Sequence, residues 1–451
     1  MNNTKVIILF LILFLSFFCF AKNSFAADLH VGSGQTYSSI ASAIAASSSG
    51  DNIIIHQGTY NEYNLQPKSG TTLSSAKRFD AETFGSEAMP IIDAQQTEYG
   101  GTYTYTIFNL SQKSNVTLDG LDIRNSDRTN VRLTDSGGNT NFLMQYCTLS
   151  MTFNGYANDN SSCLRIDPSS TNTGTVQHNT FIISGAGING VQGFQGNGAW
   201  VFKNNVIEIN SDASSGKDST GIFWKHSGTG AVQMVIENNS IHVTGASDAN
   251  GGIWMINDNV LIKNNLIYGS GIRYALTIGG SQGMSGANNC VITHNTVYGA
   301  MRAGVKTEDG DYPENSIWRD NVIVKTNPST EYSAFNLWVY GSGTHSATEE
   351  HNCIYHSGQS THFRRYGTSY NLTDWRSLGY GNGTVAENPG FANGSGNFSQ
   401  IADFEIISGG ANNGASDGAD MGCDISLLGT GISEPPADET PPANPSGLNV
   451  S

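Results

Sequence analysis

Two lysines and three arginines stand in short segments of alternating apolar and polar residues, namely Arg165, Lys225, Arg273, Arg302 and Lys306. A lysine can act as a general base when burial or nearby positive charge lowers its pKa. An arginine can neutralise a carboxylate on which negative charge develops. Together, these side chains could remove a proton that lies next to a carboxylate. A lysine that is only a solvated surface charge would look the same in the sequence.

Carboxylates form a second group of candidates, Asp218 before one such segment and Glu308 and Asp309 after another. Carboxylate oxygens are ligands that Ca²⁺ prefers, so a calcium site is one interpretation. With Asp167, the same acids could form the pair of carboxyl groups that a glycoside hydrolase requires. The commonest role of such a cluster is a solvated turn.

Aromatic side chains accompany the charged residues, with Phe223, Trp254 and Trp338 at positions expected to face outward. Such rings can stack on sugar rings and so bind a linear carbohydrate. Coverage of these rings by long loops is the alternative.

A recurring phrase predicts the framework that positions these residues. It consists of apolar and polar residues followed by Asn, any one residue and then Ile or another apolar residue, as in Ile236-Glu-Asn-Asn-Ser-Ile241. Its last Asn falls at 179, 205, 239, 265, 295, 321 and 352. A repeat of about 26–34 residues is typical of a solenoid, and the alternation within each unit is that of strands. Asn tolerates unusual backbone angles and can form a side-chain ladder when stacked. We therefore predict an all-β, right-handed parallel β-helix.

A second set of strands between the Asn phrases carries the candidate residues. We align segments that begin at Leu164, Ile188, Ile222, Ile253, Leu276, Val305 and Phe335. The first and third residues of each segment should point inward and the second and fourth outward. This alignment also places Trp224 inward. The first outward column is then Arg165, Asn189, Phe223, Trp254, Thr277, Lys306 and Asn336, and the second includes Val191, Lys225, Ile256, Glu308 and Trp338.

Composition and charge narrow the partners. The chain has 451 residues, 53 Gly and a net charge of −16, which becomes −18 without residues 1–26, because these contain Lys5 and Lys22 and no acid. This charge argues against a nucleic-acid partner. An anionic polymer would need a local basic groove or a bridging cation. We expect a monomer.

The first 26 residues have the pattern of a signal peptide: Lys5, an apolar run over 6–20, and Ser24-Phe25-Ala26 as a cleavage site. We therefore expect a secreted protein with no membrane segment after cleavage. Five cysteines remain. They are either small apolar fillers or include a disulfide between Cys147 and Cys163.

The opening of the chain resembles bacterial right-handed β-helix repeat proteins of the pectate-lyase-like superfamily, in Tyr37-Ser-Ser-Ile40, Ala43-Ile44, Gly50-Asp51 and Gly58-Thr-Tyr60. A short helix over 37–46 should cap the solenoid. The resemblance implies polysaccharide chemistry, and many members are lyases that act on uronate chains. It thereby suggests Lys225, Lys306 and Arg273 as catalytic residues, and Arg165, Phe223, Trp254, Arg302 and Trp338 as substrate-binding residues.

A shorter segment, Gly221-Ile-Phe-Trp-Lys225-His-Ser-Gly228, resembles Gly-x-x-x-Lys-x-x-Gly of calcium-dependent pectate lyases. It implies Ca²⁺ with Asp218, Glu308 and Asp309 as candidate ligands. The chain departs from that pattern at Trp254-Met-Ile-Asn257, which lacks the further lysine. The paired-Asp, Gly-His-Gly and Arg-x-Lys motifs of polygalacturonases are also absent as a set. We expect a lyase for an acidic polysaccharide, with a non-catalytic carbohydrate-binding or adhesion solenoid and a glycoside hydrolase as alternatives.

The expected domains are a signal peptide over 1–26 and a β-helix over 27–431. The sequence over 387–424 resembles the terminal coil of the same superfamily. A Pro-rich acidic linker follows over 432–446. Residues 447–451 resemble the start of a fibronectin type III module.

Overall fold

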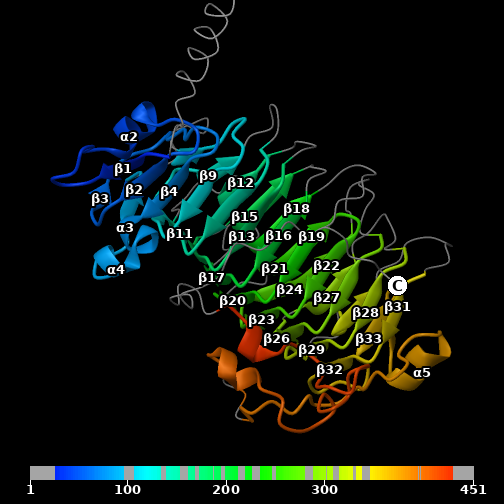
Figure 1. Ribbon diagram of the computed structural model, residues 1–451. Coiled ribbons are helices and arrows are strands. Elements are labelled where there is room, and N and C mark those ends of the chain that lie inside the picture. The colour runs from blue at the N-terminus through cyan, green and yellow to red at the C-terminus, as the bar shows by residue number, and fades with distance from the viewer. Residues whose placement is uncertain are drawn as a thin grey trace, which may run out of the picture.

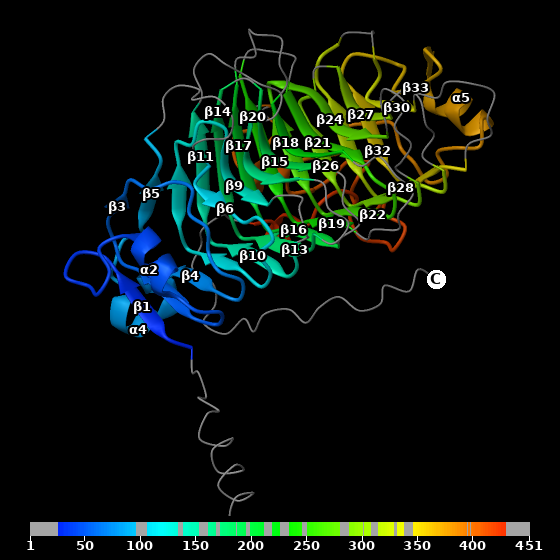
Figure 2. The same ribbon diagram turned by 90° about the horizontal axis from the view of Figure 1, so that it is seen from above.

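The protein is a parallel β-solenoid built from three long sheets (Figures 1 and 2). The computed structural model describes residues 26–95, 106–133, 139–152, 161–167, 172–185, 187–194, 199–211, 219–225, 234–245, 250–279, 288–300, 302–307, 314–328, 332–337, 346–394, 396 and 398–429. The predicted signal peptide, linker and fibronectin-like start lie outside these residues, apart from residue 26. None of the helices described is long and apolar enough to cross a bilayer.

Each sheet takes one strand from each coil, so neighbours in a sheet are parallel. Sheet A contains β1 (Asp28–Val31), β2 (Asn52–Ile55), β4 (Thr72–Ser75), β7 (Thr117–Asp119), β10 (Phe142–Gln145), β13 (Gly174–Gln177), β16 (Trp200–Lys203), β19 (Met234–Glu237), β22 (Val260–Lys263), β25 (Val291–Thr293), β28 (Ile317–Arg319) and β31 (Thr348–Glu350). Sheet B contains β3 (Thr59–Tyr60), β5 (Ile91–Asp93), β8 (Asp122–Arg124), β11 (Thr148–Thr152), β14 (Thr180–Ser184), β17 (Val206–Asn210), β20 (Ser240–Thr244), β23 (Leu266–Gly269), β26 (Thr296–Tyr298), β29 (Val322–Lys325) and β32 (Cys353–His356).

Sheet C completes each coil. It contains β6 (Phe108–Asn109), β9 (Thr129–Leu133), β12 (Ser161–Ile166), β15 (Ile188–Phe194), β18 (Thr220–Lys225), β21 (Asn250–Ile256), β24 (Ile272–Ile278), β27 (Ala303–Thr307), β30 (Phe335–Leu337), β33 (Phe363–Arg365) and β34 (Thr368–Tyr370). The last pair, β33 with β34, is antiparallel. The predicted all-β parallel solenoid is therefore confirmed.

The described helices are short. They are α2 (Ile40–Ala46), α3 (Ala76–Phe79), α4 (Ala81–Phe84), α5 (Leu372–Ser377) and the 3₁₀ turns η1 (Ile401–Phe404) and η2 (Ile425–Leu427). Helix α2 forms where the sequence predicted a helix and begins at the N-cap Ser39. It lies at the β1 end of the solenoid (Figure 1) and buries Ile40, Ala43 and Ile44 in the core. Its role as a cap stays a prediction.

The recurring asparagines form a continuous buried ladder. The backbone N–H of each one donates to Oδ1 of the next at 2.9–3.0 Å, and its Nδ2 donates to the same oxygen at 2.9–3.0 Å. Nδ2 also donates to a carbonyl of the preceding coil, as from Asn265 to Ile236. The predicted amide ladder is confirmed, and it ties each coil to both of its neighbours.

The unusual backbone angle falls one residue before each ladder position. His178, Asn204, Asn238, Asn264, His294, Asp320 and His351 have φ between 49° and 59°. Asn, Asp and His tolerate this left-handed region better than most residues. The turn and the ladder, both predicted for Asn, are thus made by different residues of the phrase. One residue makes the turn, and the next makes the ladder. Three of these seven residues are histidines, and they serve the turn.

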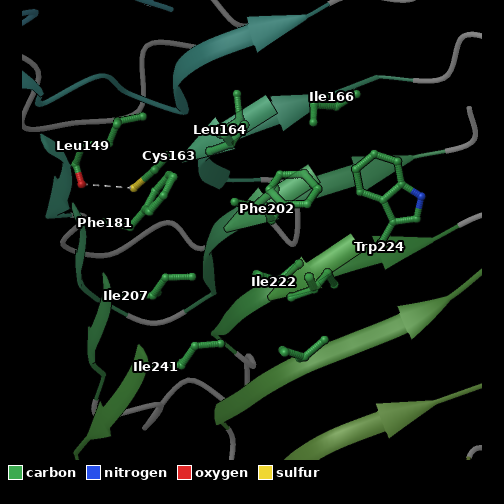
Figure 3. Packing of buried hydrophobic residues seen from close by; sticks show 14 of the residues in the cluster. Leu149, Cys163, Leu164, Ile166, Phe181, Phe202, Ile207, Ile222, Trp224 and Ile241 are labelled. Atoms are coloured by element: carbon green, nitrogen blue, oxygen red, sulfur yellow. Dashed lines mark hydrogen bonds between the residues drawn. The ribbon is translucent and has the colours of Figure 1, made fainter. Parts of the chain in front are cut away.

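Apolar columns fill the interior along all three sheets (Figure 3). Trp224 belongs to this core and is fully buried, which confirms its inward assignment. The neighbouring strand places Gly193 opposite Trp224, and a Cβ on this glycine would lie 2.1 Å from the indole. The absence of a side chain at Gly193 therefore makes room for the ring.

On sheet A, the inward-facing residue of the last strand, β31, is a carboxylate in place of an apolar residue. Glu349 pairs in register with Trp318 and is buried. Its oxygens accept hydrogen bonds from Trp375 Nε1 at 2.8 Å, Asn352 Nδ2 at 2.7 Å and Thr384 Oγ1 at 2.8 Å. Burial raises the pKa of this carboxyl group, against the effect of these donors. Glu349 thus joins the end of the ladder to helix α5.

Residues 387–394, 396 and 398–429, here called the strap, do not continue the winding of the solenoid. The strap runs back over earlier coils, since Gly422 N–H donates to Asp320 O, Asp424 N–H to Asn264 Oδ1 and Gly429 N–H to Asn238 O. A second apolar cluster seals it, with Phe391, Phe404 and Met421 against strands of sheet B. The expected terminal coil is therefore wrong for the described part of this segment.

Cysteines 147, 163, 290, 353 and 423 are all buried and unbonded to one another. The interpretation as apolar fillers is confirmed, and the alternative disulfide between Cys147 and Cys163 is wrong. The thiol of Cys163 instead approaches the carbonyl of Leu149 at 3.7 Å (Figure 3).

Candidate functional site

The outward side of sheet C carries the predicted column of polar and aromatic residues. Register pairs Arg165 with Gln192, Gln192 with Phe223, and so on. The column thus reads Asn109, Arg132, Arg165, Gln192, Phe223, Trp254, Thr277, Lys306, Asn336 and Arg364. One predicted position is wrong: Asn189 pairs with Ser162, and Gln192 takes its place.

The register of β15 differs by three residues from the predicted alignment, and this also changes the position of Val191. It pairs with Leu164 in the core column and is buried, so it does not belong to an outward column. Several residues at outward positions are nevertheless buried, including Gln192, Ile256, Thr277 and Asn336. The alternation along a strand therefore predicts to which side of the sheet a side chain points, but it does not predict whether that side chain contacts water.

A cluster of cations and tyrosines occupies the part of this face formed by β24, β27, β30 and β33. Lys306 Nζ lies 4.8 Å from the ring centroid of Tyr274, and Arg273 Cζ lies 5.2 Å from the same centroid. The rings of Tyr274 and Tyr332 meet edge to face at 5.9 Å, and Arg364 Cζ lies 5.3 Å from the Tyr332 centroid. We call these five residues the basic–tyrosine cluster. All five are partly exposed.

Adjacent coils bring this cluster together. Tyr274 is on β24, and Lys306 is on β27, the next strand of the sheet. The amide N–H of Arg302 donates to the carbonyl of Arg273 at 3.2 Å, which places a further arginine beside the cluster. The repulsion among these cations is moderated by the electron-rich faces of the tyrosines. Two of the predicted catalytic residues, Lys306 and Arg273, therefore lie around one ring.

An aromatic pair lies farther along the face. The rings of Phe223 and Trp254 meet at 5.1 Å with an interplanar angle of 69°, and both are partly exposed. Lys225 follows Phe223 by two residues on β18. With strands spaced about 4.8 Å apart, its coil lies roughly 14 Å from that of Lys306, three strands away. The structure thus separates the two predicted lysines.

The other end of the column holds an ion-paired triad. Asp167 Oδ1 accepts from Arg165 Nε at 2.5 Å, and its Oδ2 accepts from Arg132 Nε at 2.7 Å. All but a few per cent of the Asp167 side chain is shielded from solvent. Arg165 lies five strands from Lys306, about 24 Å at the ordinary spacing. It could therefore contact only a distant unit of a polymer bound at the cluster.

Four predicted site residues, Asp218, Glu308, Asp309 and Trp338, lie outside the described residues. Within the residues that are described, no three His, Cys, Asp or Glu side chains come together to hold a metal ion. The calcium interpretation therefore stays a prediction.

Sequence reasoning missed Tyr274, Tyr332 and Arg364. Tyr274 lies two residues before the aligned segment that starts at Leu276, where no outward position was assigned. Tyr332 precedes β30, and Arg364 belongs to a coil beyond the last aligned phrase. Alternation did not mark Tyr274, because it stands three residues before Thr277 and so has the opposite parity. Only the structure shows that this tyrosine and Lys306 meet.

Comparison with known proteins adds a family match and several distant structures. The family described as Disaggregatase related matches residues 252–369, about a quarter of the chain. That stretch contains Trp254 and the whole basic–tyrosine cluster. No curated protein matches this chain.

Three solved structures illustrate the structural matches. XylC in complex with xylose gives a TM-score of 0.45 and 12% identity, over 73% of this chain and 76% of that chain. A variant of the PL6 family alginate lyase AlyGC gives 0.44 and 16%, over 93% and 60%. The tailspike protein of E. coli bacteriophage HK620, in complex with a pentasaccharide, gives 0.36 and 13%, over 75% and 74%. At these scores and identities, neither a substrate nor an activity transfers to this chain.

Proposed function

We propose that the outward face of sheet C binds an acidic polysaccharide that contains uronate units and cleaves it by β-elimination. The observation that carries the proposal is the basic–tyrosine cluster. It gathers Lys306, Arg273 and Arg364 around two tyrosines in a chain whose net charge is −16. A local concentration of positive charge of this kind attracts an anionic chain despite the opposing overall field.

In the proposed reaction, Lys306 in its neutral form removes the proton on the carbon next to the uronate carboxylate. The electron pair of that C–H bond forms a double bond to the neighbouring carbon, and the bond from this carbon to the glycosidic oxygen breaks. Arg273 and Arg364 neutralise the carboxylate as it gains enolate character. Tyr274, whose ring lies beside Lys306, donates its hydroxyl proton to the departing oxygen.

Other residues of the face would bind neighbouring sugar units. Phe223 and Trp254 offer ring faces, and Arg302 adds positive charge next to Arg273. Arg165 would contact a unit farther along, and Trp338 is proposed to contribute another ring. Calcium bound by Asp218, Glu308 and Asp309 would supply further neutralisation of carboxylates.

A non-catalytic carbohydrate-binding or adhesion protein is the second candidate. The Phe223–Trp254 pair favours it, because aromatic stacking binds sugars without any proton transfer. The hydrolase alternative finds less support, since Asp167 is held by two arginines and is shielded from solvent. In each case we propose an exported monomer, which size-exclusion chromatography of secreted protein would test.

The test is a substrate screen on the protein and on one variant of it. Purified protein is mixed with pectate, alginate and glycosaminoglycans, with and without calcium, and ultraviolet absorbance of unsaturated products is followed. We expect activity on one class of polymer, lost in Lys306→Ala. No product from any polymer, together with retained binding to an insoluble glycan, would favour the binding protein over the lyase.

A further inference from the structure

The strap and sheet B enclose a pocket that lies away from the sheet C face. Its volume is about 210 Å³. The lining residues come from three consecutive coils, including Tyr298, Val324 and Tyr355, and from the strap, including Phe391 and Phe398. We call it the strap pocket.

The chemistry of the lining is that of a sugar site. Its described residues include four aromatic rings, from Tyr298, Tyr355, Phe391 and Phe398, and hydroxyl and amide groups at Thr326, Ser357, Asn388 and Asn393. None of these described lining residues carries a formal charge. Aromatic faces with a few polar groups suit a ligand that is apolar on its faces and polar at its edge. A carboxylate buried here would lack a cation, which is costly. The lining therefore selects a neutral sugar over a uronate.

Register explains why the pocket is open. Tyr298, Val324 and Tyr355 occupy the same position on β26, β29 and β32. The first and third lie two coils apart, about 9.6 Å at the ordinary spacing. Two ring faces that each contact a sugar ring at about 3.5–4.0 Å need roughly 7–8 Å. Val324 is shorter than the tyrosines, lines the pocket between them and is 4% exposed. A pyranose ring placed between the tyrosines would therefore lie against this nearly covered side chain.

Contacts among aromatic rings fix one wall of the pocket. The Tyr298 ring lies 4.0 Å from that of Phe398, 5.7 Å from Phe404 and 6.0 Å from Phe391. Burial also raises the pKa of the Tyr298 hydroxyl. A tyrosine hydroxyl is protonated at neutral pH even without this shift, so it can donate to a ligand. A preorganised wall of this kind loses little freedom when a ligand binds.

We infer that the strap pocket binds one neutral pyranose unit, separately from any polymer held on sheet C. The inference does not depend on the proposed lyase activity, because it uses other strands and another class of sugar. The strap pocket would then be a second binding site for a glycan that carries both uronate and neutral sugars.

The test uses saturation-transfer NMR on the full chain with methyl glycosides of glucose, galactose and mannose. We expect transfer to at least one of them. Tyr355→Ala should weaken that binding about tenfold or more, by removing one ring face. Val324→Phe should abolish it, by filling the space. Tyr63→Ala, which removes an exposed tyrosine outside the pocket, should leave the binding unchanged.

Transfer to none of the three glycosides would overturn the inference, as would transfer that persists in both pocket variants. Thermal unfolding of each variant separates loss of the site from loss of the fold, and Tyr355→Ala provides an independent measurement if Val324→Phe unfolds. The pocket variants should retain any cleavage of acidic polymers. Loss of the sugar site with cleavage intact therefore distinguishes this inference from the proposed function.

Discussion

Replacement of Asn265 by alanine tests the ladder on which the fold is built. The side chain is fully buried. Its Nδ2 donates to Ile236 O at 2.9 Å, Lys263 O at 3.0 Å and Asn295 Oδ1 at 2.9 Å. Its Oδ1 accepts from the backbone N–H and from Nδ2 of Asn239, at 3.0 and 2.9 Å. Alanine removes all five hydrogen bonds at once.

The expected loss follows from the groups left behind. The backbone N–H of Asn239 would be buried with no acceptor, and the Ile236 carbonyl would lose a donor. A buried polar group without a partner costs about 1–3 kcal/mol. Two such groups, together with the lost amide contacts, give an expected destabilisation of about 3–5 kcal/mol, among the larger values for single substitutions.

Two measurements check this value. Urea unfolding, followed by tryptophan fluorescence, gives the global change in stability. Hydrogen exchange at the Asn239 amide gives the local change, because solenoid coils can open separately, and protection there should fall by about 100-fold or more.

Asn210→Ala is the matched control. This asparagine is exposed at the end of β17, so its loss should change stability by less than about 0.5 kcal/mol. If Asn265→Ala were as mild as the control, the ladder would be a consequence of the winding and not a cause of its stability.

Further predictions concern the site, the core and pH. Lys306→Ala should abolish polymer cleavage, whereas Lys225→Ala, three coils away, should reduce it less than tenfold. Initial rates of cleavage measure both effects. Equal losses in the two variants would contradict the assignment of Lys306 as the base. Glu349→Gln should lower the stability by about 1–3 kcal/mol, since its NH₂ group would face the indole N–H that the carboxylate accepts; an unchanged urea midpoint would contradict this. Burial lowers the pKa of His362 to about 4, below its unfolded value near 6.5, so stability present above pH ~6.5 should decline as pH falls toward 4, and this decline should vanish in His362→Asn. Burial raises the pKa values of the thiols of Cys147, Cys163, Cys290, Cys353 and Cys423. Thiol reagents should therefore react slowly with these cysteines in the native protein at neutral pH, and quickly after unfolding. Rapid reaction in the native state would show that coils open locally.

Residues that repeat with the coil were predictable from the sequence. The recurrence of Asn265 and its equivalents fixes which positions stack, because equal places on successive coils must meet. Alternation then fixes the inward or outward parity of residues such as Trp224 and Lys306. The same logic failed at Asn189, where three glycines over 187–193 leave no side-chain pattern by which to choose the register.

Contacts between residues without a repeat were decided only in three dimensions. Arg273, Lys306 and Arg364 are spread over more than ninety residues of sequence, and loops of unequal length between coils set which of them meet at Tyr274. The strap pocket depends on a segment that folds back over coils made much earlier in the chain.

The sequence by itself therefore determined the solenoid, its stacked asparagines and the parity of strands such as β18 and β27, because these are local and periodic properties of the chain. Only the tertiary structure decided which cations share a tyrosine, that Glu349 lies in the core, and where the strap leaves a space. The physical reason is that register and long-range packing depend on side-chain volumes from distant segments, and no local pattern encodes that sum.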